Sequence, residues 1–398
     1  MHRSLLQTPP LSLYVHMPWC VRKCPYCDFN SYTLRETLPE AQYVAALERD
    51  LESQAGDVRG RPVVSIFFGG GTPSLFPPEA IGRVLEAVRH HLEVASDCEI
   101  TLEANPGTVE RGRFTGYREA GVNRVSLGAQ SFDARQLETL GRIHSPAETT
   151  RAAEELHAAG LSNFNLDLMY ALPGQDVAGA ARDVEQALSL SPAHLSHYQL
   201  TLEPGTQFAA KPPELPGDDA ATDMLAACHE QLANAGFAQY EVSAYAMPGR
   251  QCRHNLNYWS FGDYLGIGAG AHGKITFAER CEIVRTTQQR EPRRYQAGAP
   301  TAVTRKRVET ADLPFEFMMN ALRLVDGFES RLFSDRTGLD WGAVGPNLER
   351  LVARGLLVIE DSICQPTPLG LRFLNEMLVS LLPESAGLAG KQTLSTGS

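Results

Sequence analysis

Short apolar runs alternate with amphipathic stretches up to about residue 240, and this alternation constrains the fold more than any other feature. The runs at 11–17, 63–68, 99–103, 124–129, 164–168 and 194–200 predict strands, and 240–244 predicts a seventh. Helices are expected between them at 39–55, 78–92, 109–120, 146–159, 177–189 and 218–235. Six strand–helix units in series indicate a parallel sheet. The periodicity leaves open whether this sheet forms a barrel or an open doubly wound layer.

The pattern changes after residue 250. A glycine-dense stretch at 262–273 is expected to be flexible, and a polar segment follows at 286–300. Helices at 314–324, 331–337 and 344–354, a strand at 355–359 and a last helix from 367 to 382 predict a small winged-helix-like domain. We therefore expect a main α/β domain at 1–250, a linking segment at 251–310, a C-terminal α+β domain at 311–383 and a disordered tail at 384–398.

Charge and hydropathy exclude several classes of protein. The formal net charge is −11, which disfavours nucleic-acid binding because phosphate neutralisation requires a basic surface. No apolar run approaches the roughly 18 residues of a membrane span. Pro9 and Pro10 interrupt the N-terminal segment, which does not resemble a secretory signal. The chain is therefore expected to be cytoplasmic.

Three cysteines lie within eight positions, directly after the first predicted strand. Cys20, Cys24 and Cys27 have the spacing C-x3-C-x2-C, and thiolates on one short loop can converge on an iron–sulfur cluster. Three ligands leave one iron of a four-iron cluster open to another molecule. The alternatives are a zinc site, with His16 or Asp28 as a fourth ligand, and thiols that bind no metal. The other five cysteines are scattered and are expected to be core or incidental thiols.

Other residues that could bind a ligand or take part in chemistry lie at the ends of predicted strands, where barrel enzymes bind their ligands. A Gly-Gly-Gly-Thr-Pro segment at 69–73 follows the second strand, and glycine there would let the backbone approach a ligand. Glu103 ends the third strand, Gln130 follows the fourth and Asp167 lies near the end of the fifth. These positions favour a ligand site at one end of a barrel.

The cysteine loop, with Tyr26 before its last cysteine, resembles the signature of the radical S-adenosylmethionine (SAM) superfamily. The resemblance implies a partial (β/α)6 barrel, which resolves the choice left open above. It also implies a 4Fe–4S cluster on Cys20, Cys24 and Cys27, with SAM chelated at the open iron. In that superfamily, reduction of the cluster splits the sulfonium to give a deoxyadenosyl radical.

Motifs at 68–74, 103–107, 128–132 and 165–174 are similar to those of the oxygen-independent coproporphyrinogen III oxidase group. The similarity covers most of residues 11–380, including the C-terminal domain. It implies a SAM pocket formed by Tyr14, Tyr26, Gly70, Gly71, Thr72, Glu103, Gln130, Arg142 and Asp167. A side chain at Gly71 would then obstruct the amino end of SAM.

Two features separate the branches of that group. The oxidases carry a further cysteine two positions after the third, where this chain has Phe29, and a longer segment before the first strand. The chain also contains His254-Asn-Leu-Asn-Tyr-Trp259, and both features resemble the heme chaperone branch. An imidazole can ligate heme iron, and flat aromatic rings can cover a porphyrin face. His254, Tyr258 and Trp259 are therefore the expected heme contacts, and His272 is a second candidate ligand.

The resemblance implies a protein that transfers heme to apo-acceptors, which would include respiratory, membrane-associated proteins. Two other functions remain open. One is the oxidative decarboxylation of coproporphyrinogen III, and the other is a binding module in which the cluster is only a structural or redox element. Whether the chain is an enzyme that cleaves SAM, and whether it forms a homodimer, also remain open.

Overall fold

Parallel strands form the centre of a curved, twelve-stranded sheet in the computed structural model, which describes residues 6–107, 112–298 and 303–382. In spatial order the parallel strands are β11 (Asp263–Ile267), β1 (Leu11–Met17), β4 (Val63–Gly70), β5 (Val94–Ala104), β6 (Arg124–Gln130), β7 (Phe164–Tyr170) and β8 (His194–Gln199). The sheet continues as an antiparallel pair beyond β8, β10 (Ala244–Ala246) and β9 (Ala238–Glu241). Beyond β11 it continues as β12 (His272–Phe277), β13 (Glu282–Thr287) and β14 (Thr304–Arg307). Its first and last strands do not pair with each other, so the barrel is partial.

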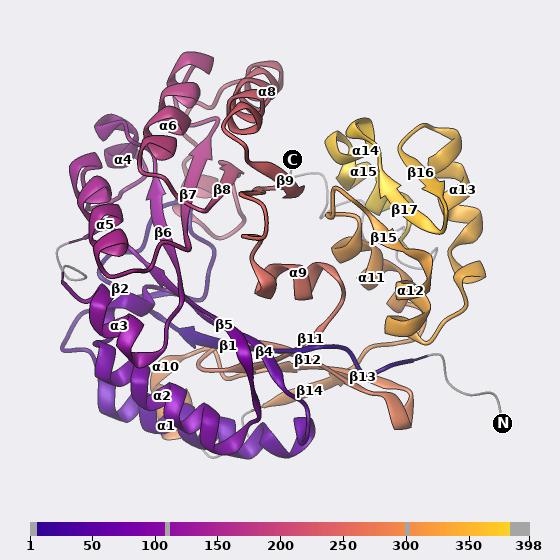
Figure 1. Ribbon diagram of the computed structural model, residues 1–398, viewed down its shortest axis with the longest axis horizontal. Coiled ribbons are helices and arrows are strands. Elements are labelled where there is room, and N and C mark those ends of the chain that lie inside the picture. Colours follow the sequence, from indigo (N-terminus) through magenta and orange to yellow (C-terminus); the bar gives the residue numbers. More distant parts are fainter. Residues whose placement is uncertain (1–5, 108–111, 299–302, 383–398) are drawn as a thin grey trace.

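Helices cover the convex face of this sheet (Figure 1). They are α1 (Glu40–Gln54), α2 (Pro78–His91), α3 (Phe114–Ala120), α5 (Pro146–Ala158), α6 (Val177–Ser189) and α8 (Asp218–Asn234), with the short α4 (Ala134–Thr139) and α7 (Gln207–Ala210) in the loops. Local sequence sets their ends: Ser145 and Glu148 form a capping box before α5, and Gly121 ends α3 at a φ of 116°. The six predicted strand–helix units and the partial barrel are thus confirmed. Part of the helix expected at 109–120 lies outside the described residues.

The prediction of a flexible segment at 262–273 is wrong. Residues 263–267 form β11, which pairs in parallel with β1 and is largely buried. Gly266 in this strand and Gly268 just after it permit close approach of neighbouring backbone. A Cβ on Gly266 would lie 2.0 Å from the carbonyl oxygen of His272, and one on Gly268 would lie 2.4 Å from that of His16. The glycine density therefore reflects tight packing rather than mobility.

The seventh predicted strand, 240–244, also differs. The chain forms a tight antiparallel hairpin there, β9 and β10, and continues into α9 (Arg253–Trp259). In Figure 1, α9 lies on the concave side of the sheet, between the barrel and the C-terminal domain. After this hairpin, α9 packs against β1, β4 and β11.

The C-terminal region is a small α+β unit, drawn in orange and yellow in Figure 1. It contains α11 (Leu313–Ala321), α12 (Ser330–Thr337), α13 (Gly345–Ala353), α14 (Pro368–Arg372) and α15 (Leu374–Ser380), with a three-stranded sheet of β15 (Phe328–Glu329), β17 (Ile363–Pro366) and β16 (Leu357–Glu360). Phe317, Phe328 and Phe333 pack edge to face at its centre. The winged-helix-like outline is as predicted, although β17 was not expected and the last predicted helix is interrupted at Phe373.

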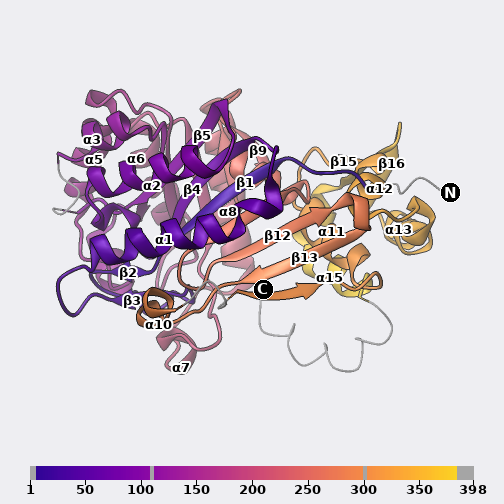
Figure 2. The same ribbon diagram turned by 90° about the horizontal axis from the view of Figure 1, so that it is seen from below.

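The strands β12 and β13 extend beneath the barrel towards this unit, beside the short α10 (Pro292–Ala297), as Figure 2 shows. The tail expected at 384–398 lies outside the described residues, and the domain boundaries given above remain predictions. No helix among the described residues combines the length and hydropathy needed to cross a bilayer.

Candidate functional site

One cavity of about 770 Å³ inside the barrel is lined by every residue expected to bind the cluster, SAM or heme, except the second candidate heme ligand, His272. The cysteine loop, the ends of β4 to β7 and helix α9 all contribute to its wall. Parallel strands bring their carboxyl ends to one edge, so residues distant in sequence meet there. Its lining includes Tyr14, Cys20, Cys24, Tyr26, Cys27, Gly70, Gly71, Thr72, Glu103, Gln130, Arg142, Asp167, His254, Tyr258 and Trp259.

The cysteine loop places its three thiols, all free and half-buried, on this cavity. Nowhere in the described ranges do three or more His, Cys, Asp or Glu side chains converge as ligands of a single metal ion. A zinc site requires such convergence, whereas each cysteine of a four-iron cluster binds a different iron. No fourth cysteine lines the cavity within the described residues, so the donor set fits a cluster with one open iron.

Arg142 connects the cysteine loop to the barrel strands. Its Nη1 donates to Cys24 Sγ at 3.6 Å, and its Nη2 donates to the carbonyl oxygen of Gly128 at 2.9 Å and to Asn105 Oδ1. Asn105 in turn donates from Nδ2 to Thr72 Oγ1 at 2.9 Å. Asn105 lies within a motif noted in the sequence, but sequence reasoning gave it no role. Its two contacts make it the link between the expected SAM residues Arg142 and Thr72.

The SAM contact of Gly70 and Gly71 stays a prediction, and the structure adds a packing constraint at both positions. A Cβ on Gly71 would lie 2.6 Å from the carbonyl oxygen of Trp19 and 2.7 Å from that of Met17, and one on Gly70 would overlap the ring of His16. These atoms belong to β1 and the start of the cysteine loop. Glycine is therefore required for packing of the loop against β4, and a side chain at Gly71 would disturb this packing whether or not SAM binds there.

Two carboxyl groups line the cavity. Glu103 accepts from the Gly70 amide at 3.1 Å, and burial, followed by the nearby charge of Asp167, raises its pKa to about 8. Asp167 accepts from Asn165 Nδ2 at 2.7 Å and from Ser126 Oγ at 3.3 Å, and burial raises its pKa as well. Glu103 is therefore mainly protonated at neutral pH and can donate a hydrogen bond to a ligand.

Helix α9 fixes His254 at the opposite end of the strands from the cysteines. His254 Nδ1 lies 3.0 Å from Ser65 Oγ near the start of β4, and Asn257 Nδ2 donates to Ser12 Oγ near the start of β1 at 2.8 Å. His254 is only 1% exposed, and burial and the charge of Arg124 lower its pKa to about 3. The imidazole is thus neutral, the form that ligates a metal.

Two buried nitrogens of the α9 motif have no hydrogen-bond partner among the described residues, His254 Nε2 and Trp259 Nε1. Buried polar atoms are normally satisfied, so such atoms on a cavity wall suit a site that receives a ligand. Sequence reasoning also missed Arg124 and His194, which line the deep end of the cavity. Arg124 is fully buried, and nothing in its sequence context signals that it faces inward.

A second cavity, of about 510 Å³, adjoins the first and shares Tyr14, Tyr258 and Trp259 with it. It lies between the cysteine loop, strands β11 to β13 and the C-terminal unit. His272 lines it and is exposed, with its Nδ1 3.3 Å from Thr287 Oγ1. The two candidate heme ligands are therefore separated: His254 faces the cofactor cavity and His272 the outer one, with Tyr258 and Trp259 between.

Comparison with known proteins agrees with this arrangement. Residues 14–187 match the model of the radical SAM superfamily, and residues 308–373 match the HemN C-terminal domain. The solved structure of the radical SAM enzyme coproporphyrinogen III oxidase (HemN) from Escherichia coli aligns with a TM-score of 0.79 at 23% identity, over 96% of this chain and 91% of that one. The fold and the cysteine loop at its mouth define a radical SAM protein.

The similarity to individual proteins is closer still. The chain is 50% identical to the heme chaperone HemW of Escherichia coli over 96% of this chain and 100% of that protein. It is 47% identical to HemW of Haemophilus influenzae, over 94% of this chain and 99% of that protein. A mouse protein, mitochondrial radical S-adenosyl methionine domain-containing protein 1, is 35% identical over 94% of this chain. The chain belongs to the HemW family.

Proposed function

We propose that this chain is a heme chaperone, which binds heme, a 4Fe–4S cluster and SAM and delivers heme to acceptor proteins. The observation that carries the proposal is the placement of α9. This helix puts the neutral imidazole of His254 on the cofactor cavity and the rings of Tyr258 and Trp259 on the wall shared by the two cavities, and it leaves His254 Nε2 and Trp259 Nε1 unpartnered among the described residues. The names of the HemW relatives support the same function.

Individual residues of the chain would carry out separate parts of this function. Cys20, Cys24 and Cys27 would hold the cluster, and the expected SAM residues surround the space beside it. When bound, the cluster and SAM supply one-electron chemistry at the sulfonium. Glu103, protonated and held by the Gly70 amide, can donate a hydrogen bond to a polar ligand group, and Arg142 holds the Cys24 sulfur towards the cavity.

Heme would occupy the space around Tyr258 and Trp259. We retain His254 as the proposed ligand, because its neutral imidazole has a free Nε2 and its Nδ1 is fixed by Ser65. His272 is the alternative. We further propose that the acceptors include respiratory, membrane-associated proteins, that the chain is cytoplasmic and that it forms a homodimer. These three points go beyond the family relationship.

Anaerobically purified protein tests the proposal. A heme chaperone should bind heme with a defined Soret band and pass it to an apo-acceptor such as a heme-depleted respiratory enzyme, measured as recovered acceptor activity. The same preparation should form no protoporphyrinogen from coproporphyrinogen III. Porphyrinogen turnover without heme transfer would instead establish the oxidase function.

A further inference from the structure

The outer cavity combines aromatic walls with a basic rim. Its volume is about 510 Å³, and it opens between the cysteine loop and the C-terminal unit. Phe29, which is 59% exposed beside the third cysteine, forms part of its apolar surface. The other aromatic lining residues are Tyr14, Tyr258, Trp259, Phe261 and Tyr264, and the basic ones are His272, Lys274, Arg285 and Arg290.

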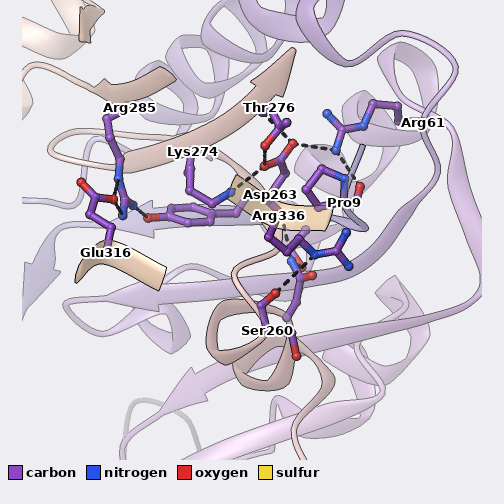
Figure 3. Close-up of polar contacts among 12 residues, drawn as sticks. Pro9, Arg61, Ser260, Asp263, Lys274, Thr276, Arg285, Glu316 and Arg336 are labelled. Carbon is purple, nitrogen blue, oxygen red and sulfur yellow. Dashed lines mark hydrogen bonds and ion pairs between the residues drawn. The ribbon is translucent and has the colours of Figure 1, made fainter. Parts of the chain in front are cut away.

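Two of the basic residues are already paired with carboxylates (Figure 3). Lys274 Nζ donates to Asp263 Oδ1 at 2.8 Å, and Asp263 also accepts from Arg61. Arg285 donates from Nε to Glu316 Oε2 at 3.1 Å, and from Nη1 to the Tyr264 hydroxyl. These pairs fix the wall of the cavity, and they leave little capacity for an external anion.

Arg290 is different, because its guanidinium has no carboxylate partner in the described part of the chain. Its backbone is nevertheless well placed: its carbonyl oxygen accepts from Asn30 Nδ2 at 3.0 Å and from the Tyr32 hydroxyl at 3.2 Å. The cysteine loop thus holds Arg290 at the cavity rim, near His272.

The acidic residues of the cavity do not neutralise this rim. Burial and Asp167 favour the protonated form of Glu103, and Asp28, which is exposed on the cysteine loop, forms no ion pair with Arg290 among the described residues. The cavity therefore has aromatic walls and, at its edge, a guanidinium without a carboxylate partner among the described residues. This combination fits a flat apolar molecule that carries carboxylate arms.

We propose that Arg290 binds a carboxylate side arm of the tetrapyrrole, so that the edge of the macrocycle bearing the carboxylates lies in the outer cavity. This inference rests on the proposed function, because it assigns an orientation to the heme of that function. A guanidinium binds a carboxylate with two parallel N–H···O bonds, so it can fix the rotation of the ring as well as add affinity. SAM also carries a carboxylate, and the test must separate the two sources.

The experiment compares heme with its dimethyl ester, in which both carboxylates are blocked. Binding of each is titrated by Soret absorbance to the wild-type, full-length protein and to Arg290→Gln. Arg293→Gln is the matched control, because Arg293 is three positions away, its side chain is 84% exposed and it does not line the cavity. The wild-type protein and Arg293→Gln should bind heme roughly three- to tenfold more tightly than the ester, and higher salt should reduce the difference. Arg290→Gln should lose the preference and retain SAM affinity by calorimetry.

Every alternative result would contradict one specific part of the proposal. Equal wild-type affinity for heme and ester, or equal losses in Arg290→Gln and Arg293→Gln, would remove the carboxylate site and leave the chaperone function intact. Loss of SAM affinity in Arg290→Gln, with unchanged heme affinity, would assign Arg290 to the SAM carboxylate. Failure of the wild-type protein to bind either porphyrin would overturn the proposed function itself.

Discussion

Ser65 Oγ lies 3.0 Å from Nδ1 of His254, so a strand residue near the start of β4 fixes the orientation of an imidazole on α9. Residues 189 positions apart thus form one unit at the deep end of the cavity. The contact holds one ring nitrogen and leaves Nε2 directed away from the hydroxyl. Oriented histidines of this kind are typical of metal ligands, in which the second nitrogen is held by a neighbouring group.

Replacement of His254 by alanine should shift the Soret band and weaken heme retention, because the axial nitrogen is removed. Ser65→Ala should weaken heme binding by roughly tenfold without abolishing it, as loss of an orienting partner does at other metal sites. Soret titration measures both effects, and the iron–sulfur absorption should stay unchanged, because the cysteines lie at the other end of the strands. His272→Ala is the comparison variant. If it shifts the Soret band while His254→Ala does not, the ligand is His272.

The cluster should depend on the cysteine loop alone. Cys24→Ser should abolish the broad iron–sulfur absorption, since serine oxygen is a hard ligand and a poor substitute for sulfur. Cys98→Ser and Cys364→Ser should retain it, because both residues are buried away from the cavity. Iron and sulfide analysis after anaerobic reconstitution provides the measurement. Four irons in the Cys24→Ser protein would contradict the ligand assignment.

Substitution of Gly71 should lower the stability of the fold, whether or not this residue contacts SAM. Gly71→Ala places a Cβ against the carbonyl oxygens of Trp19 and Met17, and overpacking of this kind costs about 2 kcal/mol in the free energy of unfolding. Gly56→Ala is the control, because a Cβ there has no neighbour within 4 Å. Denaturant titration of the two variants should show a loss only in Gly71→Ala. An unchanged midpoint with reduced SAM affinity would restore the role of Gly71 as a ligand cradle.

The barrel strands were predictable because buried parallel strands are nearly continuous apolar runs, as in β1, where Tyr14 is the only residue that is not buried. The cysteine spacing likewise indicated the loop that we propose to hold the cluster. Two features were not predictable from local sequence, namely the close packing around the glycines near β11 and the outer cavity. Gly266 and Gly268 are short-range signals of a turn, and only the positions of β12 and β1 show that they permit close packing.

The outer cavity was missed for a related reason. Arg290 lies in the polar segment at 286–300, which has no periodicity of its own, and Arg285 directly precedes it. Their placement depends on β13 pairing with β12 and on the contact between Asn30 of the cysteine loop and Arg290. Both are long-range contacts, so the basic character of this rim follows from the tertiary structure.

The protonated state of Glu103 has a consequence for stability that can be measured without any ligand. Burial and Asp167 raise its pKa from 4.5 to about 8 in the folded protein, so between these values the folded state holds a proton that the unfolded state has released. The free energy of unfolding therefore decreases as pH rises through this window. Burial also raises the pKa values of Asp50 and Asp183, both to about 6, and that of Asp167, so the contribution of Glu103 is obtained over pH 6.5 to 8 by comparison with a variant changed only at this residue. Glu103→Gln cannot ionise and should lose stability less steeply over that range, by about 1 kcal/mol per pH unit. Denaturant titrations of the two proteins without cofactors, at several pH values, measure this difference, and parallel profiles would mean that Glu103 is ionised in the folded state.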